Sequence, residues 1–245
     1  PEKNVVQFAI RSLGLSEISI FNPKEKIIDY ILESENKNLT SLSINDFSDE
    51  LSSNSPAPGG GSVSALSGSL GASLMAMVSN LTYNKKGYKD NNQLVLDIGV
   101  KAQALKKDLL LLIDKDTEAF NGIMAAFKLS KKTESEKKQR EQAILTATKN
   151  AIDTPLLIME KCNQLLHLSY DLTRYGNKNS FSDTAVAVEL LNSAIKGAAY
   201  NVMINLKDIN DRRYAISINK KINDIMDLTG SMYKKILKII NKELQ

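Results

Sequence analysis

Apolar side chains recur along the chain at the three- and four-residue spacing of amphipathic helices, and polar breaks separate these stretches. The pattern predicts two short helices over residues 5–15 and 24–33, followed by a polar linker. Longer helices are expected near residues 62–83, 93–129, 134–152, 155–172, 183–206 and 213–244. No segment alternates as a strand does, so the predicted fold class is all-α, an antiparallel helical bundle.

The linker marks a change in composition near residue 40. Its sequence, SENKNLTSLSIND, is almost entirely polar. We therefore divide the chain into an N-terminal tail of residues 1–40 and a helical domain of residues 41–245. Ser43 or Asn45 is expected to cap a short helix that carries Phe47 and Leu51.

Two helix starts carry capping residues. Thr133 and Glu136 have the spacing of a capping box. Asp153 or Thr154 is expected to cap the following helix, because Pro155 suits the first position of a helix. The pattern thus predicts a helix boundary between these two starts.

Residues 52–83, SSNSPAPGGGSVSALSGSLGASLMAMVSNLTY, begin as a stiff turn and continue as a helix with few bulky side chains. Glycine and alanine recur there at helical spacing, which predicts close packing against a neighbouring helix or another subunit. The three glycines after Pro58 are consistent with a flexible turn. They are also consistent with an anion site, because N–H groups at a helix start are free to bind one.

Composition narrows the functional classes. The net charge is +4, and basic residues are interspersed with acidic ones, which argues against a nucleic-acid partner. A single cysteine, Cys162, cannot form an intrachain disulfide, which fits a reducing, cytoplasmic setting. We see no run that we expect to span a membrane and no signal peptide. Residue 1 is proline, so we expect a processed or trimmed chain or a fragment.

Asp116 is the most informative polar residue. A helical projection places it within an apolar stripe of residues 105–127. The stripe is formed by Leu105, Leu109, Leu112, Phe120, Ile123 and Phe127. Burial raises the pKa of a carboxylic acid, which suits proton transfer. Pairing with a lysine or capping a neighbouring helix is the equally weighted alternative.

Other polar residues allow both structural and binding interpretations. In the break GNKNSFSD, Asn177, Ser182 and Asp183 are typical of a turn and a helix cap. Asn201 and Asn205 share one helix face, where they require polar partners. Lys85 and Lys86 suit a solvated loop or a site for a polyanionic tail. His167 is expected to be a surface or packed residue, and with one cysteine we predict no metal site.

Several sequence blocks together resemble one known family. SPAPGGGSVSALSGSLGASLMAMVSNLT, LTYNKKGY, IDKDTEAFNGIMAAFKL and GNKNSFSDTAVAVELLNSAIKGAAYNVMINLKDI occur in the order found in formimidoyltetrahydrofolate cyclodeaminases and methenyltetrahydrofolate cyclohydrolases. The likeness covers about residues 42–243. The first thirty or so residues resemble the segment that joins the transferase of the bifunctional formiminotransferase-cyclodeaminase to its cyclodeaminase domain. Asn84 and Gly87 depart from the family pattern, which often has glycine and lysine there.

The resemblance implies an all-helical homodimer with its active site near the subunit interface. It implies conversion of 5-formimidoyltetrahydrofolate to 5,10-methenyltetrahydrofolate with release of ammonia, a step of histidine degradation and one-carbon metabolism. Methenyltetrahydrofolate cyclohydrolase and a non-catalytic interaction domain are the alternatives. The folate, which could carry a polyglutamate tail, is the substrate, and no metal or other cofactor is expected. A formiminotransferase domain is a further expected partner.

The same resemblance implies roles for individual residues. Asp116 matches the family's catalytic aspartate. The substrate-binding residues are expected to be Pro58, Gly59, Gly60, Gly61, Ser62, Lys85, Lys86, Asn177, Asp183, Asn201 and Asn205.

Overall fold

The computed structural model describes residues 8–15, 17, 21, 26 and 38–244. Residues 8–12 are helical and residues 13–15 form a turn, whereas residues 5–7 and nearly all of the second predicted helix lie outside the described residues. The chain divides into two compact units, residues 1–47 and 48–245. This division falls within α4 (Ile44–Leu51), whereas the boundary predicted near residue 40 rests on composition and stays a prediction. A short 3₁₀ helix, η1 (Leu39–Ser41), precedes α4.

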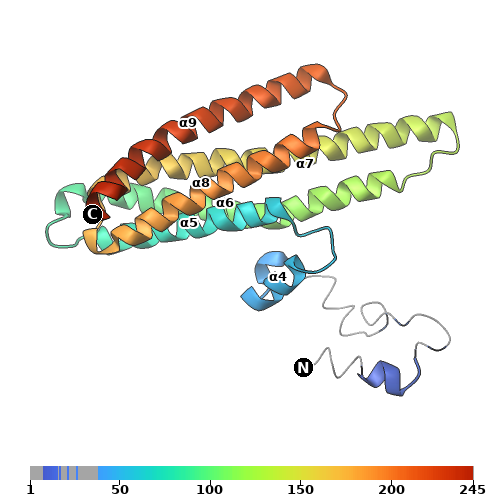
Figure 1. Ribbon diagram of the computed structural model, residues 1–245, viewed down its shortest axis with the longest axis horizontal. Helices are drawn as coiled ribbons and strands as arrows, with labels where there is room; N and C mark the ends of the chain where they lie inside the picture. Colours follow the sequence, from blue (N-terminus) through green and yellow to red (C-terminus); the bar gives the residue numbers. More distant parts are fainter. Residues whose placement is uncertain (1–7, 16, 18–20, 22–25, 27–37, 245) are drawn as a thin grey trace. The chain divides into compact units, whose positions relative to one another are not determined.

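The second unit is an all-α antiparallel bundle, as predicted (Figure 1). Its helices are α5 (Gly60–Thr82), α6 (Asn92–Phe127), α7 (Glu134–Tyr175), α8 (Phe181–Leu206) and α9 (Arg212–Leu244). Two 3₁₀ turns, η2 (Lys89–Asn91) and η3 (Lys178–Ser180), lie in the connections. No strand occurs within residues 38–244.

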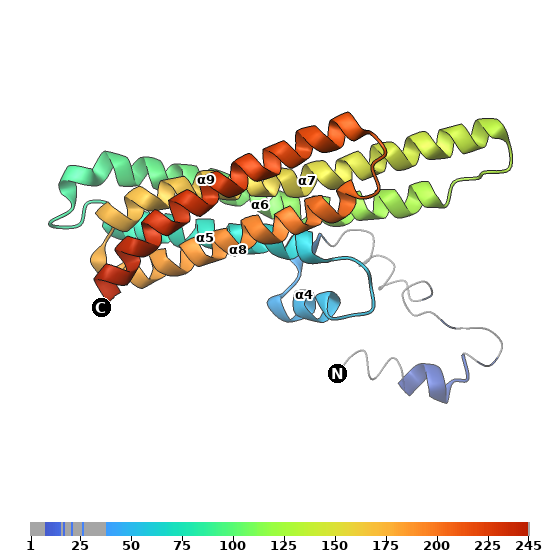
Figure 2. The same ribbon diagram turned by 45° about the horizontal axis from the view of Figure 1, so that its top comes forward.

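The four helices α5 to α8 surround one core, with α5 and α7 each packed against both α6 and α8. Helix α9 runs along α7 and α8, as the two views show (Figure 2). The connected ends of α6 and α7 extend beyond the other helices of the bundle (Figure 1). This extension explains why the apolar stripe of α6 is buried at Leu109 and Leu112, whereas Phe127 is half exposed.

Close packing of α5 follows from its small residues, as predicted. A Cβ placed on Gly68 would lie 2.5 Å from Sγ of Cys162, and one on Gly71 would lie 3.2 Å from the Ala187 carbonyl oxygen. Contrary to the sequence-based expectation, α5 is by length and composition apolar enough to cross a membrane. However, 61% of its most apolar stretch is buried within the bundle, as expected for a core helix.

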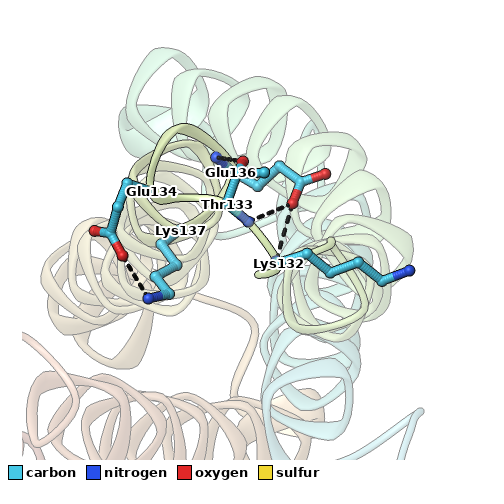
Figure 3. Close-up of polar contacts among 5 residues, drawn as sticks. All are labelled: Lys132, Thr133, Glu134, Glu136 and Lys137. Carbon is cyan, nitrogen blue, oxygen red and sulfur yellow. Dashed lines mark hydrogen bonds and ion pairs between the residues drawn. The ribbon is translucent and has the colours of Figure 1, made fainter.

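Helix α7 starts with the predicted capping box (Figure 3). The Thr133 hydroxyl accepts a bond from the Glu136 backbone N–H at 3.2 Å, and the Glu136 carboxylate accepts one from the Thr133 N–H at 2.8 Å. The carboxylate also accepts from the Lys132 N–H at 2.9 Å. Together these contacts satisfy backbone donors that a helix start otherwise leaves unpaired.

The predicted helix boundary at Pro155 is wrong, because α7 continues through this residue. Proline has no N–H to donate to the carbonyl one turn earlier, at Ala151. The side-chain amide of Asn205, on α8, donates to that carbonyl at 2.8 Å instead. A residue on another helix therefore compensates for the missing backbone bond.

The start of α8 differs slightly from the predicted one. Helix α8 begins at Phe181 after Ser180, so Ser182 and Asp183 lie in its first turn and do not cap it.

Asn84 has a left-handed backbone, with φ 57°, which asparagine tolerates better than most residues. A family pattern with glycine at this position is consistent with that conformation.

Candidate active site

The start of α5 forms one wall of the candidate site. Pro58 is buried, and Gly59 is the extended residue immediately before the helix, with φ −134°. Gly60 is exposed at the first helical position. Backbone N–H groups in a first helical turn have no partner within the helix, and they carry a partial positive charge. This end of α5 therefore offers hydrogen-bond donors on a surface that a ligand can reach.

Asp116, on α6, lies directly against this helix start. A Cβ placed on Gly61 would be 2.0 Å from Oδ1 of Asp116, 2.4 Å from Cγ and 2.5 Å from Oδ2. No side chain larger than hydrogen fits at Gly61 while the carboxylate keeps this position. Glycine is therefore required here for close approach, not for an unusual backbone angle.

Ser62 connects the two helices. Its hydroxyl lies 3.0 Å from the Ile113 carbonyl oxygen, 3.2 Å from Oδ2 of Asp116 and 3.3 Å from the Thr117 hydroxyl. The Ser62 backbone N–H also acts to lower the pKa of the Asp116 carboxyl group. These contacts hold the carboxyl group in one orientation at the helix start.

Burial is the main influence on the charge of Asp116. Desolvation raises the pKa of this carboxyl above its ordinary value of 3.8, although the hydrogen bonds from Ser62 act in the opposite direction. A carboxylate that accepts a proton more readily than usual is suited to general base and then general acid catalysis.

Asn201, on α8, forms another wall. Its Nδ2 would lie 3.2 Å from a Cβ placed on Gly60, and it donates to the Gly197 carbonyl oxygen at 2.8 Å. Within the described part of the chain, no hydrogen-bond donor reaches its side-chain oxygen. The candidate site thus combines a helix start, a carboxylate and an amide from α5, α6 and α8.

Asn205 lies one turn further along α8 than Asn201. Its side-chain amide is bonded to Ala151 in α7, so it has a structural task beside Pro155. Whether it also contacts a substrate stays a prediction.

The remaining predicted residues lie at the opposite end of α5. Lys85 donates to Oδ1 of Asn177 at 2.6 Å, and the Asn177 N–H donates to the Thr82 hydroxyl at 2.8 Å. Asp183 is half-buried in the first turn of α8, and Lys86 is exposed. Because a helix rises about 1.5 Å per residue, roughly 30 Å of α5 separates this group from Gly61.

Apart from Asn205, which bonds to Ala151, the structure divides the predicted residues into two groups within one chain. The first, which we call the glycine-end group, consists of Pro58, Gly59, Gly60, Gly61, Ser62, Asp116 and Asn201. The second, the lysine-end group, consists of Lys85, Lys86, Asn177 and Asp183.

Thr117 was missed in the sequence. It lies within hydrogen-bond distance of Ser62, although it is outside the apolar stripe that identified Asp116. A hydroxyl immediately after the candidate carboxylate was the available signal. Among the described residues, no cluster of three or more histidine, cysteine, aspartate or glutamate side chains could hold a metal ion.

Family models match both parts of the chain. Residues 43–224 match the model described as formiminotransferase-cyclodeaminase, and residues 1–33 match the formiminotransferase domain. The first match contains the whole of both groups defined above.

Curated relatives agree with these matches. The chain is 31% identical to formimidoyltransferase-cyclodeaminase of Gallus gallus over 98% of its own length and 45% of that protein. It therefore spans less than half of this relative. It is 34% identical to methenyltetrahydrofolate cyclohydrolase of Methylorubrum extorquens, over 82% of its own length and 97% of that protein.

A solved structure has the same fold. The crystal structure of formiminotetrahydrofolate cyclodeaminase from Thermotoga maritima superposes with a TM-score of 0.77 at 29% identity. The match covers 85% of this chain and 100% of that chain. The bundle observed here therefore has the same fold as that cyclodeaminase structure.

Proposed function

The chain belongs to the formiminotransferase-cyclodeaminase family, and we propose that it converts 5-formimidoyltetrahydrofolate to 5,10-methenyltetrahydrofolate with release of ammonia. The observation that carries this proposal is the Asp116 carboxyl group, seated against Gly61 at the open start of α5. Its raised pKa suits a group that accepts a proton and then returns it.

In the proposed reaction, the aminobenzoyl nitrogen attacks the carbon of the protonated formimino group on the pterin nitrogen. A carbon–nitrogen bond forms and gives a tetrahedral carbon. Asp116 accepts the proton that leaves the attacking nitrogen and gives a proton to the departing amino group. The bond to that group breaks, ammonia leaves, and the positively charged methenyl bridge remains. No oxidation state changes, so we propose that the reaction needs no redox cofactor.

Neighbouring groups would orient the reactants. Ser62 holds the Asp116 carboxyl group, and the side-chain oxygen of Asn201 can accept a hydrogen bond from an amino or amide group of the folate. The exposed backbone at Gly60 leaves a path for the substrate. Fixing the reacting atoms beside the carboxylate lowers the barrier by orientation as well as by proton transfer.

Methenyltetrahydrofolate cyclohydrolase is the second candidate. It is favoured by the relative of that name, 97% of which this chain covers. The match of residues 1–33 to a formiminotransferase domain favours the cyclodeaminase, and it supports the proposal that the chain works with such a domain. Both reactions pass through a tetrahedral carbon between the same two nitrogens, so the same carboxylate serves either.

We further propose that the enzyme is a homodimer. Helix α5 contains no charged residue, and its outer face exposes a row of aliphatic side chains. The row consists of Val63 (37% exposed), Leu70 (49%), Met77 (37%) and Leu81 (49%). An aliphatic row on a helix without charges is typical of a surface that another subunit covers.

An antiparallel pairing of α5 with its copy would complete the site. In such a twofold dimer, the lysine-end group of one subunit approaches the glycine-end group of the other. This arrangement would account for substrate-binding residues at both ends of one helix. We propose that each active site is composed of residues from two subunits.

The first experiment measures both products. Purified protein receives 5-formimidoyltetrahydrofolate, and methenyltetrahydrofolate absorbance and released ammonia are followed, with Asp116→Asn alongside. Equal formation of both by the wild type and loss in the variant would support the cyclodeaminase. Decay of added methenyltetrahydrofolate, without release of ammonia from 5-formimidoyltetrahydrofolate, would favour the cyclohydrolase. Absence of both signals would favour a non-catalytic domain.

A second experiment tests the composite site. Asp116→Asn and Asp183→Asn, each inactive alone, are unfolded together and refolded. Random pairing in a twofold dimer leaves one intact site in each mixed dimer, which predicts recovery of about a quarter of the wild-type activity. No recovery from inactive parents, or an active Asp183→Asn protein, would contradict the composite site.

A further inference from the structure

A basic cleft lies where the end of α7, η3 and the start of α8 meet the last turns of α9. Its volume is about 510 Å³, within the size range of small-molecule sites. Four cationic side chains line it, together with one acid and two aromatic rings. They are Arg174, Lys178, Lys238, Lys242, Glu243, Tyr175 and Phe181.

The positive charges exceed the available negative charges. Glu243 lies 3.7 Å from Lys178, whose side chain is 75% exposed, so this pair is weak. The other three cations form no ion pair with a carboxylate in the part of the chain that the structure describes.

Helix dipoles do not remove this excess. The C-terminal ends of α7 and α9 each contribute about half a negative charge, and the N-terminal end of α8 contributes about half a positive charge. After these contributions and that of Glu243, an excess of roughly two and a half positive charges remains in the cleft. If the lysines served only to compensate the negative C-terminal ends of α7 and α9, no net positive charge of this size would remain in the cleft.

Arg174 is held in place without a carboxylate. Its guanidinium lies 4.9 Å from the ring centre of Tyr175 and 5.4 Å from that of Tyr170. A cation–π contact does not use the N–H groups as donors to a carboxylate, so they remain available for an anion. This side chain is therefore prepared for binding before a ligand arrives.

The cleft is separate from the glycine-end group of the same chain, although it adjoins the lysine-end group, because Gly176 and Lys178 in its wall flank Asn177. Gly176, in its wall, adjoins Val78 near the end of α5, since a Cβ there would lie 3.3 Å from the Val78 side chain. Asp116 adjoins Gly61 at the other end of the same helix. Binding in the cleft can therefore be measured without folate turnover.

We propose that this cleft binds a small ligand with at least two negatively charged groups, either phosphates or carboxylates. The arrangement of Arg174 on one side and Lys238 and Lys242 on the other favours a ligand whose charges are distributed along its length. The proposal concerns binding alone and does not depend on the proposed function.

The test uses inorganic tripolyphosphate and citrate as probes, in separate calorimetric titrations of the whole chain. The cleft variant is Lys238→Gln with Lys242→Gln. The matched control is Lys220→Gln with Lys221→Gln, which removes two exposed lysines from the same helix but outside the cleft. Arg174→Gln is a second cleft variant, and thermal unfolding checks that every protein is folded.

We expect the wild type and the control to bind at least one probe, and the cleft variants to bind it about tenfold more weakly, a usual scale for losing charged hydrogen-bond donors. Tighter binding of tripolyphosphate would identify a phosphate ligand, and tighter binding of citrate a polycarboxylate. The proposal is wrong if the wild type binds neither probe with a Kd below about 1 mM. It is also wrong if the cleft and control variants lose affinity equally.

Discussion

Replacing Gly61 with alanine tests the central contact of the candidate site. The new methyl group would start 2.0 Å from Oδ1 of Asp116, whereas non-bonded carbon atoms settle at about 3.5 Å or more. Since all three outer atoms of the carboxyl group lie within 2.5 Å of this position, rotating the group does not relieve the contact. The whole carboxyl group must retreat by more than about 1 Å.

The expected loss of activity is much larger than the loss of stability. Misplacing a catalytic group by about 1 Å can cost on the order of a hundredfold in rate. The same substitution gains helix propensity of about 0.5–1 kcal/mol, which offsets part of the cost of a displaced side chain, about 0.5–1.5 kcal/mol. We therefore expect a folded protein with at least about a hundredfold lower kcat.

The assay compares glycines that differ in their surroundings. Gly60→Ala meets Nδ2 of Asn201 at 3.2 Å and should lose less activity than Gly61→Ala. Gly122→Ala, on the same helix as Asp116, meets nothing within 4 Å and should keep full activity. Turnover is followed by methenyltetrahydrofolate absorbance, and thermal unfolding is recorded for each variant. A Gly61→Ala enzyme with turnover close to that of the wild type would refute the proposed role of this carboxylate.

The other predictions concern stability. Because the folded-state pKa of Asp116 is raised, Asp116→Asn should increase Tm at neutral pH. This gain should shrink as the pH falls through that raised pKa and vanish below the ordinary value of 3.8. Asn205→Leu should cost about 1–3 kcal/mol in urea unfolding, because the Ala151 carbonyl loses its donor, and Pro155→Ala should reduce that cost by restoring a backbone N–H. Thr133→Ala should lower stability by about 1 kcal/mol, equivalent to about 2–4 °C in Tm.

Each of these predictions has a result that contradicts it. A pH-independent difference between Asp116→Asn and the wild type would show that the carboxyl group titrates alike in the folded and unfolded states. Additive effects of Asn205→Leu and Pro155→Ala in a double-mutant cycle would exclude the proposed compensation. An unchanged Tm in Thr133→Ala would mean that the capping box contributes little to α7.

Local pattern predicted the features that depend on residues close together in the chain. The helical periods and the capping box at Thr133 were predicted and are confirmed. For His167 the sequence left a surface and a packed position open, and the structure shows it exposed. The stripe that contains Asp116 was recognised for the same reason, since residues three and four apart share a helix face. The resemblance of several sequence blocks led to the family that the comparisons then showed.

Contacts between distant residues required the tertiary structure. The contact between Gly61 and Asp116 joins two helices, and Pro155 is tolerated within α7 because Asn205, on α8, bonds to Ala151. Such contacts depend on how far one helix is shifted and rotated against another, which neither periodicity nor capping specifies.

The sequence by itself determined that this protein is helical, where most of its helices lie, and that Asp116 is the carboxylate to examine. Only the tertiary structure decided which polar residues accompany it. The glycine-end group lies beside Asp116, whereas the lysine-end group lies roughly 30 Å away along α5. The physical reason is that helix formation is governed by neighbours within a turn or two, whereas a site is assembled by the packing of whole helices.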